Sequence, residues 1–296
     1  MVGLTGMIRL DAATVLLQWA VGGLLFLWVT TRRREVGIGY GWLLRAVYGV
    51  LAVGAVAAGR IGDAVIVRDV AAVAVVAATV VAFGVSVLRR RAGVSGQRAV
   101  EERRSTRVAA MTGIDRAEVE REVEAAEFPP VLDLVAPVVG AVGLIAAGVA
   151  AVSGDAGAYD VAVSVLRTLV GAAFLGAVSD AMLLGHWYLV QPGLARGPLN
   201  ELNRWLAVVW PFEIVALLLP TGMLSVLSGS VEDGYGGILG WFWLACAITT
   251  IVLCFVTQAA LKERAYSAVM AATGLLYLAI LTAFGTDLVA RAVLSG

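Results

Sequence analysis

The sequence predicts an all-α integral membrane protein, folded as a polytopic bundle of about eight transmembrane helices. Of its 296 residues, 60% are hydrophobic and only 15% are charged, whereas about 25% of the residues in an ordinary soluble domain are charged. Apolar stretches of about 20 residues, enough to cross the hydrocarbon core of a bilayer, recur along the whole chain. We therefore expect the lipid bilayer to be the solvent of this protein.

Eight stretches are long enough to span: 12–31, 42–59, 69–88, 131–152, 161–190, 205–227, 237–258 and 266–290. The first resembles a signal peptide only in its position. Most of its flanking basic residues lie on its C-terminal side, at Arg32 to Arg34, and no small-residue cleavage site follows. We expect this stretch to remain in the protein as a membrane anchor.

The distribution of basic residues predicts the orientation. The connections after spans 1, 3, 5 and 7 are basic, whereas the alternate connections are acidic or poor in Arg. Basic loops are retained on the cytoplasmic side, so both termini are predicted to lie outside. All basic residues except Lys262 are Arg, and Ala, Val and Gly are abundant. This composition is typical of a bacterial protein, and the predicted location is the bacterial cytoplasmic (inner) membrane.

A polar insert over 92–130 separates spans 1–3 (1–91) from spans 4–8 (131–296). The stretch Arg89 to Arg107 holds seven Arg, which suits anionic lipid headgroups. The stretch Thr112 to Glu127 is predicted to form a cytoplasmic amphipathic helix that ends at Pro129. Two interpretations are open for this helix: a solvated surface helix, or a docking site for another protein subunit.

The two halves show an internal similarity. A shift of 159 positions places Trp28 on Trp187 and Arg45 on Arg204. Each half then has a span that ends in Trp, a cytoplasmic loop with Gly, and an Arg at the start of the next span. This pattern predicts a 4+4 parallel internal repeat, although matches between apolar helices also arise by chance.

Ionisable groups inside hydrocarbon are costly and mark functional sites. Asp180 lies in span 5 and Glu213 in span 6, at similar predicted heights above the cytoplasmic ends. If the two carboxyl groups face each other, at least one is expected to keep its proton near neutral pH. Pro211 removes one backbone hydrogen bond just before Glu213, and Pro220 is expected to act likewise nearer the outside.

His186 is the one histidine of the chain, and Trp187 and Tyr188 follow it at the cytoplasmic end of span 5. Three interpretations compete. The imidazole could hydrogen-bond a quinone or relay protons, ligate a single haem b together with a second residue, or only hydrogen-bond a neighbouring span. The cofactor is therefore unknown from the sequence, with quinone or haem b as the options.

Three further arginines lie near the ends of spans. Arg45 and Arg204 are candidates for binding an anionic headgroup or substrate, although retention of basic residues on the cytoplasmic side is the favoured explanation. Asp287 and Arg291 are one helical turn apart and are expected to pair with each other or with lipid.

Several function classes find no support. The formal net charge is zero and the basic residues are scattered, which excludes a nucleic-acid surface. The sequence contains no metal-site motif and no nucleophile and base arrangement, so a stand-alone enzyme is not predicted. The leading hypothesis is a subunit of a respiratory or other electron-transfer complex that handles quinone or protons at His186, Asp180 and Glu213. The alternatives are a proton-coupled transporter or channel and a non-catalytic membrane anchor for other subunits.

Overall fold

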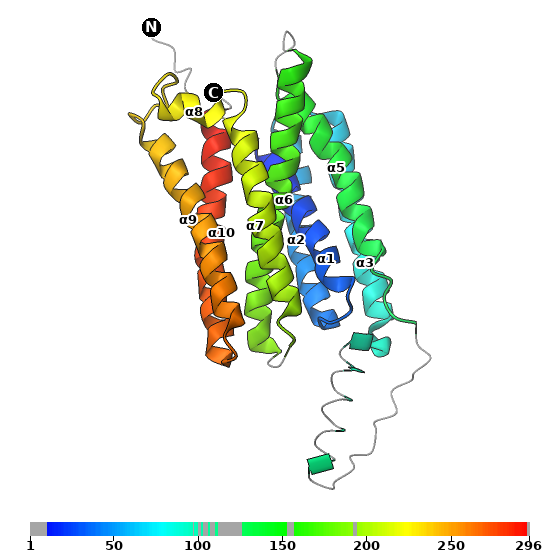
Figure 1. The fold of residues 1–296 in the computed structure, drawn as a ribbon. Coiled ribbons are helices and arrows are strands. Elements are labelled where there is room, and N and C mark those ends of the chain that lie inside the picture. Colours follow the sequence, from blue (N-terminus) through cyan, green and yellow to red (C-terminus); the bar gives the residue numbers. More distant parts are fainter. Residues whose placement is uncertain are drawn as a thin grey trace.

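The structure is a computed structural model that describes residues 11–96, 98–99, 102, 106, 110–111, 126–152, 157–191 and 194–294. Throughout these ranges the chain is helical, without strands (Figure 1). The helices are α1 (Ala12–Thr31), α2 (Ile38–Ile61), α3 (Ile66–Leu88), η1 (Arg90–Ala92), α5 (Leu132–Ala150), α6 (Ala158–Val190), α7 (Gly197–Leu218), α8 (Gly222–Leu227), α9 (Ile238–Lys262) and α10 (Tyr266–Leu294). The predicted helix over 112–127 lies, except for its last two residues, outside the described part of the chain.

Seven of the described helices are long and apolar enough to cross a membrane: α1, α2, α3, α5, α6, α9 and α10. The prediction of an all-helical, multi-pass membrane protein is confirmed to this extent. Helix α7 is also long, with 22 residues, but Glu201, Arg204 and Glu213 make it more polar than the other seven. The count of eight spans therefore stays a prediction.

The bounds predicted for the sixth span, 205–227, are wrong. Helix α7 begins eight residues earlier, at Gly197, because Pro198 is accommodated in the first turn, where its missing N–H is not needed. It ends at Leu218 because the residue before a proline, here Leu219 before Pro220, is disfavoured in helical conformation. The remainder of the predicted span forms the separate short helix α8.

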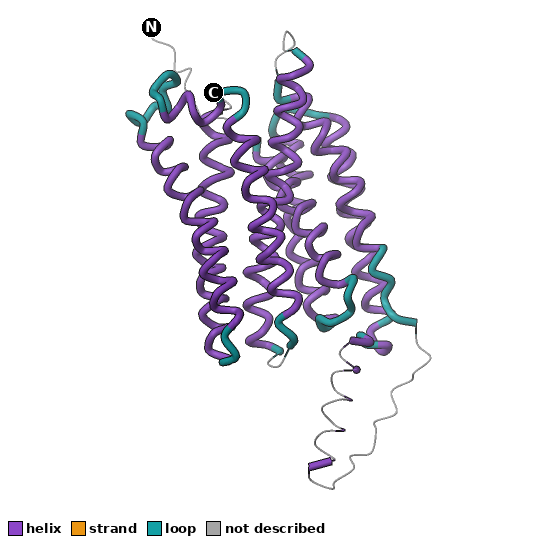
Figure 2. The backbone as a smooth tube through the Cα atoms, in the orientation of Figure 1, coloured by secondary structure: helices purple, strands orange, loops and turns teal. Residues whose placement is uncertain are grey.

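The long helices form two rings of four. In the first ring, α1, α2, α3 and α5 pack in sequence order and α5 returns to α1; in the second ring, α6, α7, α9 and α10 do the same, and α10 returns to α6. The loops lie at the two ends of the bundle (Figure 2). The connections α1–α2, α6–α7 and α9–α10 and the residues after α3 share one end, which we call the basic end because it holds the arginine-rich connections (Figure 1).

The two rings meet where α1 and α5 pack against α6, and glycine makes the contact between α1 and α6 possible. A Cβ atom at Gly22 would lie 1.7 Å from the backbone oxygen of Ala172, and one at Gly176 would lie 2.1 Å from the backbone carbon of Gly22. No side chain fits at either position. The backbones of α1 and α6 are therefore in direct contact at the centre of the molecule, as small residues allow in membrane helix pairs.

Candidate functional site

Asp180 lies at the contact between the two rings, completely buried. Its Oδ1 accepts a hydrogen bond from the hydroxyl of Tyr48 on α2, and its backbone oxygen accepts one from the hydroxyl of Tyr40 at 3.4 Å. The Tyr48 ring fits because Gly23 of α1 has no side chain: a Cβ there would lie 2.1 Å from the ring. In the described structure, Oδ2 of Asp180 is buried without a hydrogen-bond partner.

Glu213 lies in a second buried cluster, inside the second ring and toward the end opposite to the basic end. The side chain has no exposed surface. The charged groups with which it interacts are Asp287, Arg291 and Arg167. Among the described residues no group donates a hydrogen bond to either of its carboxyl oxygens. The Asp287 carboxylate beside it can only accept a hydrogen bond, and only from a protonated Glu213.

The two arginines near Glu213 direct their hydrogen bonds to other acceptors. Arg291 donates from Nε to both carboxyl oxygens of Asp287, at 2.9 and 2.8 Å, and from Nη2 to the backbone oxygen of Arg167. The pairing predicted for Asp287 and Arg291 is thus confirmed. Arg167 donates to the backbone oxygens of Ala216, at 3.0 Å, and Leu219.

The carbonyl of Ala216 is free to accept this bond because Pro220, four residues on, has no N–H to donate. Pro220 thereby fixes Arg167 on the end of α7. The sequence indicated that this proline would release a backbone acceptor, but it gave no sign that Arg167 would be the donor.

Asp180 and Glu213 do not share a site. Asp180 points toward the first ring and bonds Tyr48, whereas Glu213 interacts with groups on α6 and α10. The prediction of similar height is also wrong. Glu213 lies 16 residues after the start of α7, about 24 Å along the axis, whereas Asp180 lies 10 residues before the end of α6, about 15 Å. The error follows from the earlier start of α7.

His186 is on an exposed face of α6, away from Asp180. Its Nδ1 is hydrogen-bonded to the hydroxyl of Tyr277 on α10 at 3.0 Å, with the two rings edge to face. This is the geometry of the interpretation in which His186 bonds a neighbouring span.

The two aromatic residues after His186 hold the end of α6. Trp187 donates from Nε1 to Oε1 of Gln191 at 3.0 Å, and its ring meets the ring of Tyr40 edge to face. Tyr188 is buried, and its hydroxyl donates to the backbone oxygen of Ala195 at 2.5 Å. These contacts fix the connection to α7. Through Tyr40, which bonds the backbone oxygen of Asp180, Trp187 borders the Asp180 cluster, whereas neither aromatic residue is among the groups around Glu213.

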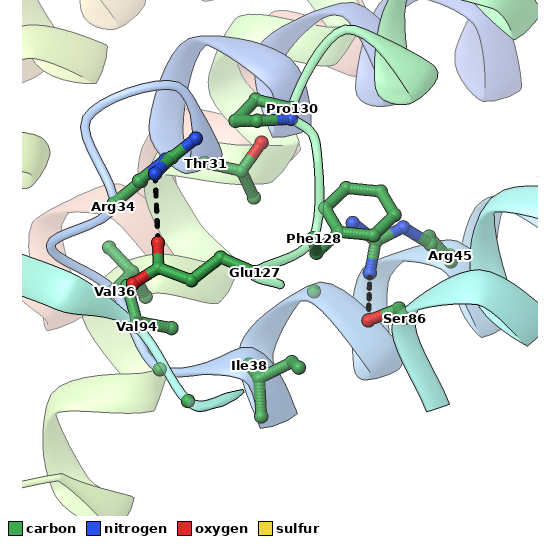
Figure 3. A pocket seen from close by; sticks show the side chains of 13 residues that line it. Thr31, Arg34, Val36, Ile38, Arg45, Ser86, Val94, Glu127, Phe128 and Pro130 are labelled. Carbon is green, nitrogen blue, oxygen red and sulfur yellow. Dashed lines mark hydrogen bonds and ion pairs between the residues drawn. The ribbon is translucent and has the colours of Figure 1, made fainter. Parts of the chain in front are cut away.

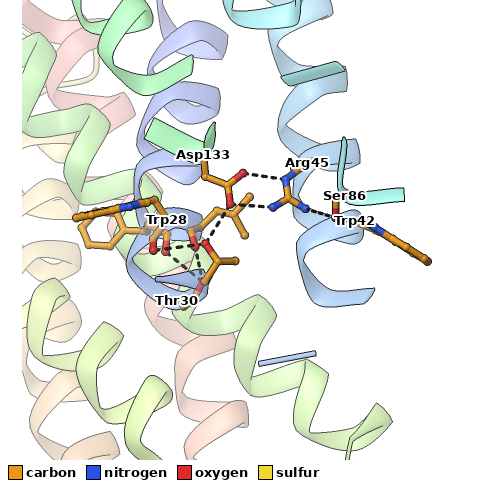
Figure 4. A network of polar contacts seen from close by, with 9 residues as sticks. Trp28, Thr30, Trp42, Arg45, Ser86 and Asp133 are labelled. Atoms are coloured by element: carbon orange, nitrogen blue, oxygen red, sulfur yellow. Dashed lines mark hydrogen bonds and ion pairs between the residues drawn. The ribbon is translucent and has the colours of Figure 1, made fainter. Parts of the chain in front are cut away.

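Arg45 is buried at the basic end of the first ring, in the network shown in Figure 4. It forms a two-pronged ion pair with Asp133 of α5, with both nitrogen to oxygen distances at 2.8 Å, and donates to Oγ of Ser86 at 3.2 Å. The hydroxyl of Thr31 donates to the same carboxylate at 3.0 Å. Arg204, which the internal similarity aligns with Arg45, is exposed instead.

Comparisons with protein-family models, with curated proteins and with solved structures give no match to this chain. The function is therefore argued from the geometry of these clusters.

Proposed function

We propose that this chain is a membrane subunit that binds and releases protons inside its helix bundle, with Glu213 as the proton-binding carboxyl group. One observation carries the proposal: within the described structure, Glu213 is wholly buried and neither carboxyl oxygen has a hydrogen-bond donor. A charged carboxylate without donors is very unfavourable in a low-dielectric interior. A proton bound to Glu213 removes that penalty.

The neighbours of Glu213 suit a group that changes charge. Arg291 is already paired with Asp287, and Arg167 is held by backbone oxygens. Asp287 repels an ionised Glu213, whereas Arg291 and Arg167 attract it, although neither arginine bonds it. Release of the proton is therefore opposed by burial and by Asp287 and favoured by the two arginines.

Asp180 is the second proton-binding group in the proposal. Tyr48 bonds one of its oxygens, and the other has no partner among the described residues. Its position between the rings places it nearer the middle of the bundle than Glu213. The two carboxyl groups would act in series, with Asp180 near the middle of the bundle and Glu213 nearer the end opposite to the basic end, rather than as a pair.

We further propose that α7 is the eighth span and that the basic end faces the cytoplasm of a bacterium, with both termini outside. Helix α7 runs beside α6 and α9 within the second ring, and its 22 residues are enough to cross. Arginine-rich connections gather at one end of the bundle (Figure 1), as expected for cytoplasmic loops.

The matching ring topology supports the proposal that the chain arose as a 4+4 repeat. Each ring closes between its first and fourth helix, so α1 corresponds to α6 and α2 to α7. The alignment of Trp28 with Trp187 and of Arg45 with Arg204 follows the same correspondence.

We propose that this binding and release of protons is part of electron transfer in a respiratory or related complex. The observation behind this is the exposed His186, bonded to Tyr277 near the basic end, where a membrane-dissolved quinone could approach it. Proton-coupled transport of a solute is the second candidate, and the two-ring arrangement favours it because many carriers are built from repeated halves.

Infrared difference spectroscopy of the purified protein tests the core proposal. The wild type is expected to show a carboxylic acid C=O band at neutral pH to which Glu213 and Asp180 both contribute, and Glu213→Gln should remove the Glu213 part of it. Glu232→Gln, which changes an exposed glutamate, is the matched control and should retain the band. If the band is missing from the wild type or unaffected by Glu213→Gln, the proposal is wrong.

Two further measurements separate the two processes. An organic extract and an absorption spectrum of the gently solubilised protein would contain quinone or haem if electron transfer is correct. Solute uptake into proteoliposomes, driven by a pH gradient and abolished by Glu213→Gln, would establish transport instead.

A further inference from the structure

A pocket opens at the basic end of the first ring, between the α1–α2 connection and the segment that leads into α5 (Figure 3). Arg34 and Glu127 lie at one side, Phe128 and Arg45 at the other, and Val36 and Ile38 supply apolar surface. The pocket is separate from both buried carboxyl groups.

Glu127 is the centre of an arginine cluster beside this pocket. Its Oε2 accepts from Nη1 of Arg34 at 2.9 Å, its Oε1 is bonded by Arg98, and its backbone oxygen accepts from Nη1 of Arg89 at 2.8 Å. Three arginines thus converge on a residue with one negative charge. The cluster made by Arg34, Arg89 and Arg98 therefore has an excess of two positive charges.

Among the described residues, Glu127 is the one acidic side chain that forms an ion pair with Arg34 or Arg98. Arg45, next to the pocket, is already neutralised by Asp133 and is covered by the ring of Phe128, whose centroid lies 4.3 Å from the guanidinium carbon. The side chains of Arg34 and Arg98 are 44% and 30% exposed. They can therefore turn to a larger anion without first being released from the protein interior.

A phosphate group fits this cluster better than a carboxylate does. Guanidinium groups bind phosphate through paired hydrogen bonds, and a phosphate offers more acceptor oxygens than one carboxylate. Because the pocket lies at the end of membrane-spanning helices and has apolar walls at Val36 and Ile38, the glycerol and first methylene groups of a lipid also find contacts there.

We propose that this cluster is a binding site for the phosphate of an anionic membrane lipid, and that Glu127 occupies the site when the lipid is absent. Binding displaces the Glu127 carboxylate from Arg34 and Arg98. The segment that carries Phe128 then loses its main polar attachment to the α1–α2 connection. The lipid thereby controls how firmly the polar insert is held against the first ring.

Native mass spectrometry of the full chain with added phosphatidylglycerol tests the proposal. The double variant Arg34→Gln/Arg98→Gln should bind this lipid at least about tenfold more weakly, the factor expected for one lost charge-assisted hydrogen bond. Arg33→Gln is the matched control, since Arg33 belongs to the same arginine run but pairs with Glu201. Binding by this control should stay within about twofold of the wild type.

Glu127→Gln gives the decisive result, because a gain of binding cannot come from misfolding. Removal of the competing carboxylate should strengthen phosphatidylglycerol binding several-fold. Equal weakening by Arg33→Gln, or no gain with Glu127→Gln, would overturn the proposal. Competition by inorganic phosphate at the same concentration as the lipid would show that the site takes a soluble anion, and it would also overturn the assignment to lipid.

Discussion

The hydroxyl of Tyr48 donates a hydrogen bond to Oδ1 of Asp180, and this bond joins α2 of the first ring to α6 of the second. Both side chains are completely buried. Substitution Tyr48→Phe leaves the Asp180 carboxyl without its donor, which is expected to lower the free energy of unfolding by about 1–3 kcal/mol. Unfolding in mixed micelles, followed by circular dichroism, measures this change.

A double-mutant cycle with Asp180→Asn isolates the bond itself. Interhelical hydrogen bonds in membranes couple by about 0.6 kcal/mol on average and about 1.7 kcal/mol at most, so a coupling in that range is expected. Tyr235→Phe, which alters an exposed tyrosine in the connection before α9, should leave the unfolding free energy unchanged. A coupling of zero would show that Tyr48 and Asp180 do not interact in the membrane.

The contact between α1 and α6 makes a second prediction. Since a Cβ at Gly22 would overlap the backbone of α6, Gly22→Val must separate the two rings, and a loss of about 3 kcal/mol or more is expected. Gly84→Ala is the control, because no described atom lies within 4 Å of its added Cβ. Alanine favours a helix over glycine by about 0.5–1 kcal/mol, so this control should stabilise the protein slightly. Similar effects at both positions in the micelle unfolding experiment would contradict the direct contact.

The seven long apolar helices were predictable from the sequence because an apolar stretch of sufficient length has few alternatives in a bilayer, whereas the bounds of the more polar α7 were not. The partners of the ionisable groups could not be predicted from the sequence. Lipid-facing and interior surfaces of membrane helices are both apolar, so periodicity does not show which way Asp180 or Glu213 points. Tyr48 carried no signal that set it apart from the tyrosines at span ends. Only Asp287 and Arg291 were paired correctly, because their spacing on one helix fixes the contact locally.

The tertiary contacts of the arginine run Arg32 to Arg34 could not be predicted from the sequence either. Its sequence position indicated cytoplasmic retention, and nothing in it indicated tertiary contacts. In the structure, Arg32 and Arg33 pair with Glu201 at the start of α7, while Arg34 pairs with Glu127 before α5. Arg34 also has a left-handed backbone, with φ at 55°, which non-glycine residues seldom adopt. Sequence reasoning had no means to detect this turn.

Arg45 and Arg204 provide a third prediction, because aligned residues have opposite environments. Arg45→Leu leaves Asp133 buried without its partner, and breaking a buried pair in this way costs about 3–5 kcal/mol. Arg204→Leu removes an exposed charge and should change the unfolding free energy by less than about 0.5 kcal/mol. The double variant Arg45→Leu/Asp133→Leu should recover most of the loss. Failure of that rescue would mean that Arg45 stabilises the protein through Phe128 or Ser86 rather than through Asp133.

The last prediction concerns Asp233, in the connection before α9. The backbone N–H of Gly237 donates to Oδ1 at 2.8 Å, that of Tyr235 donates to Oδ1 at 2.9 Å, and that of Leu239 donates to Oδ2 at 2.8 Å. The bond from Gly237 contributes most to lowering the pKa of Asp233 below its ordinary value; burial opposes it, and the bonds from Tyr235 and Leu239 add to it. Hydrogen bonds that favour the charged carboxylate have this effect.

The lowered pKa of Asp233 determines how the stability of this connection changes with pH. A lowered pKa in the folded state means that Asp233 stabilises this connection fully above the ordinary aspartate value of about 3.9, and that the contribution disappears as the pH falls through the lowered pKa. Amide hydrogen exchange at Gly237 and Leu239, corrected for the intrinsic pH dependence, should therefore accelerate in that acidic range. Asp233→Asn should abolish the pH dependence, whereas Asp63→Asn, at an exposed aspartate between α2 and α3, should preserve it. If the protection of these amides from hydrogen exchange does not change down to the lowest pH, the three N–H groups keep their hydrogen bonds to Asp233 without the carboxylate charge.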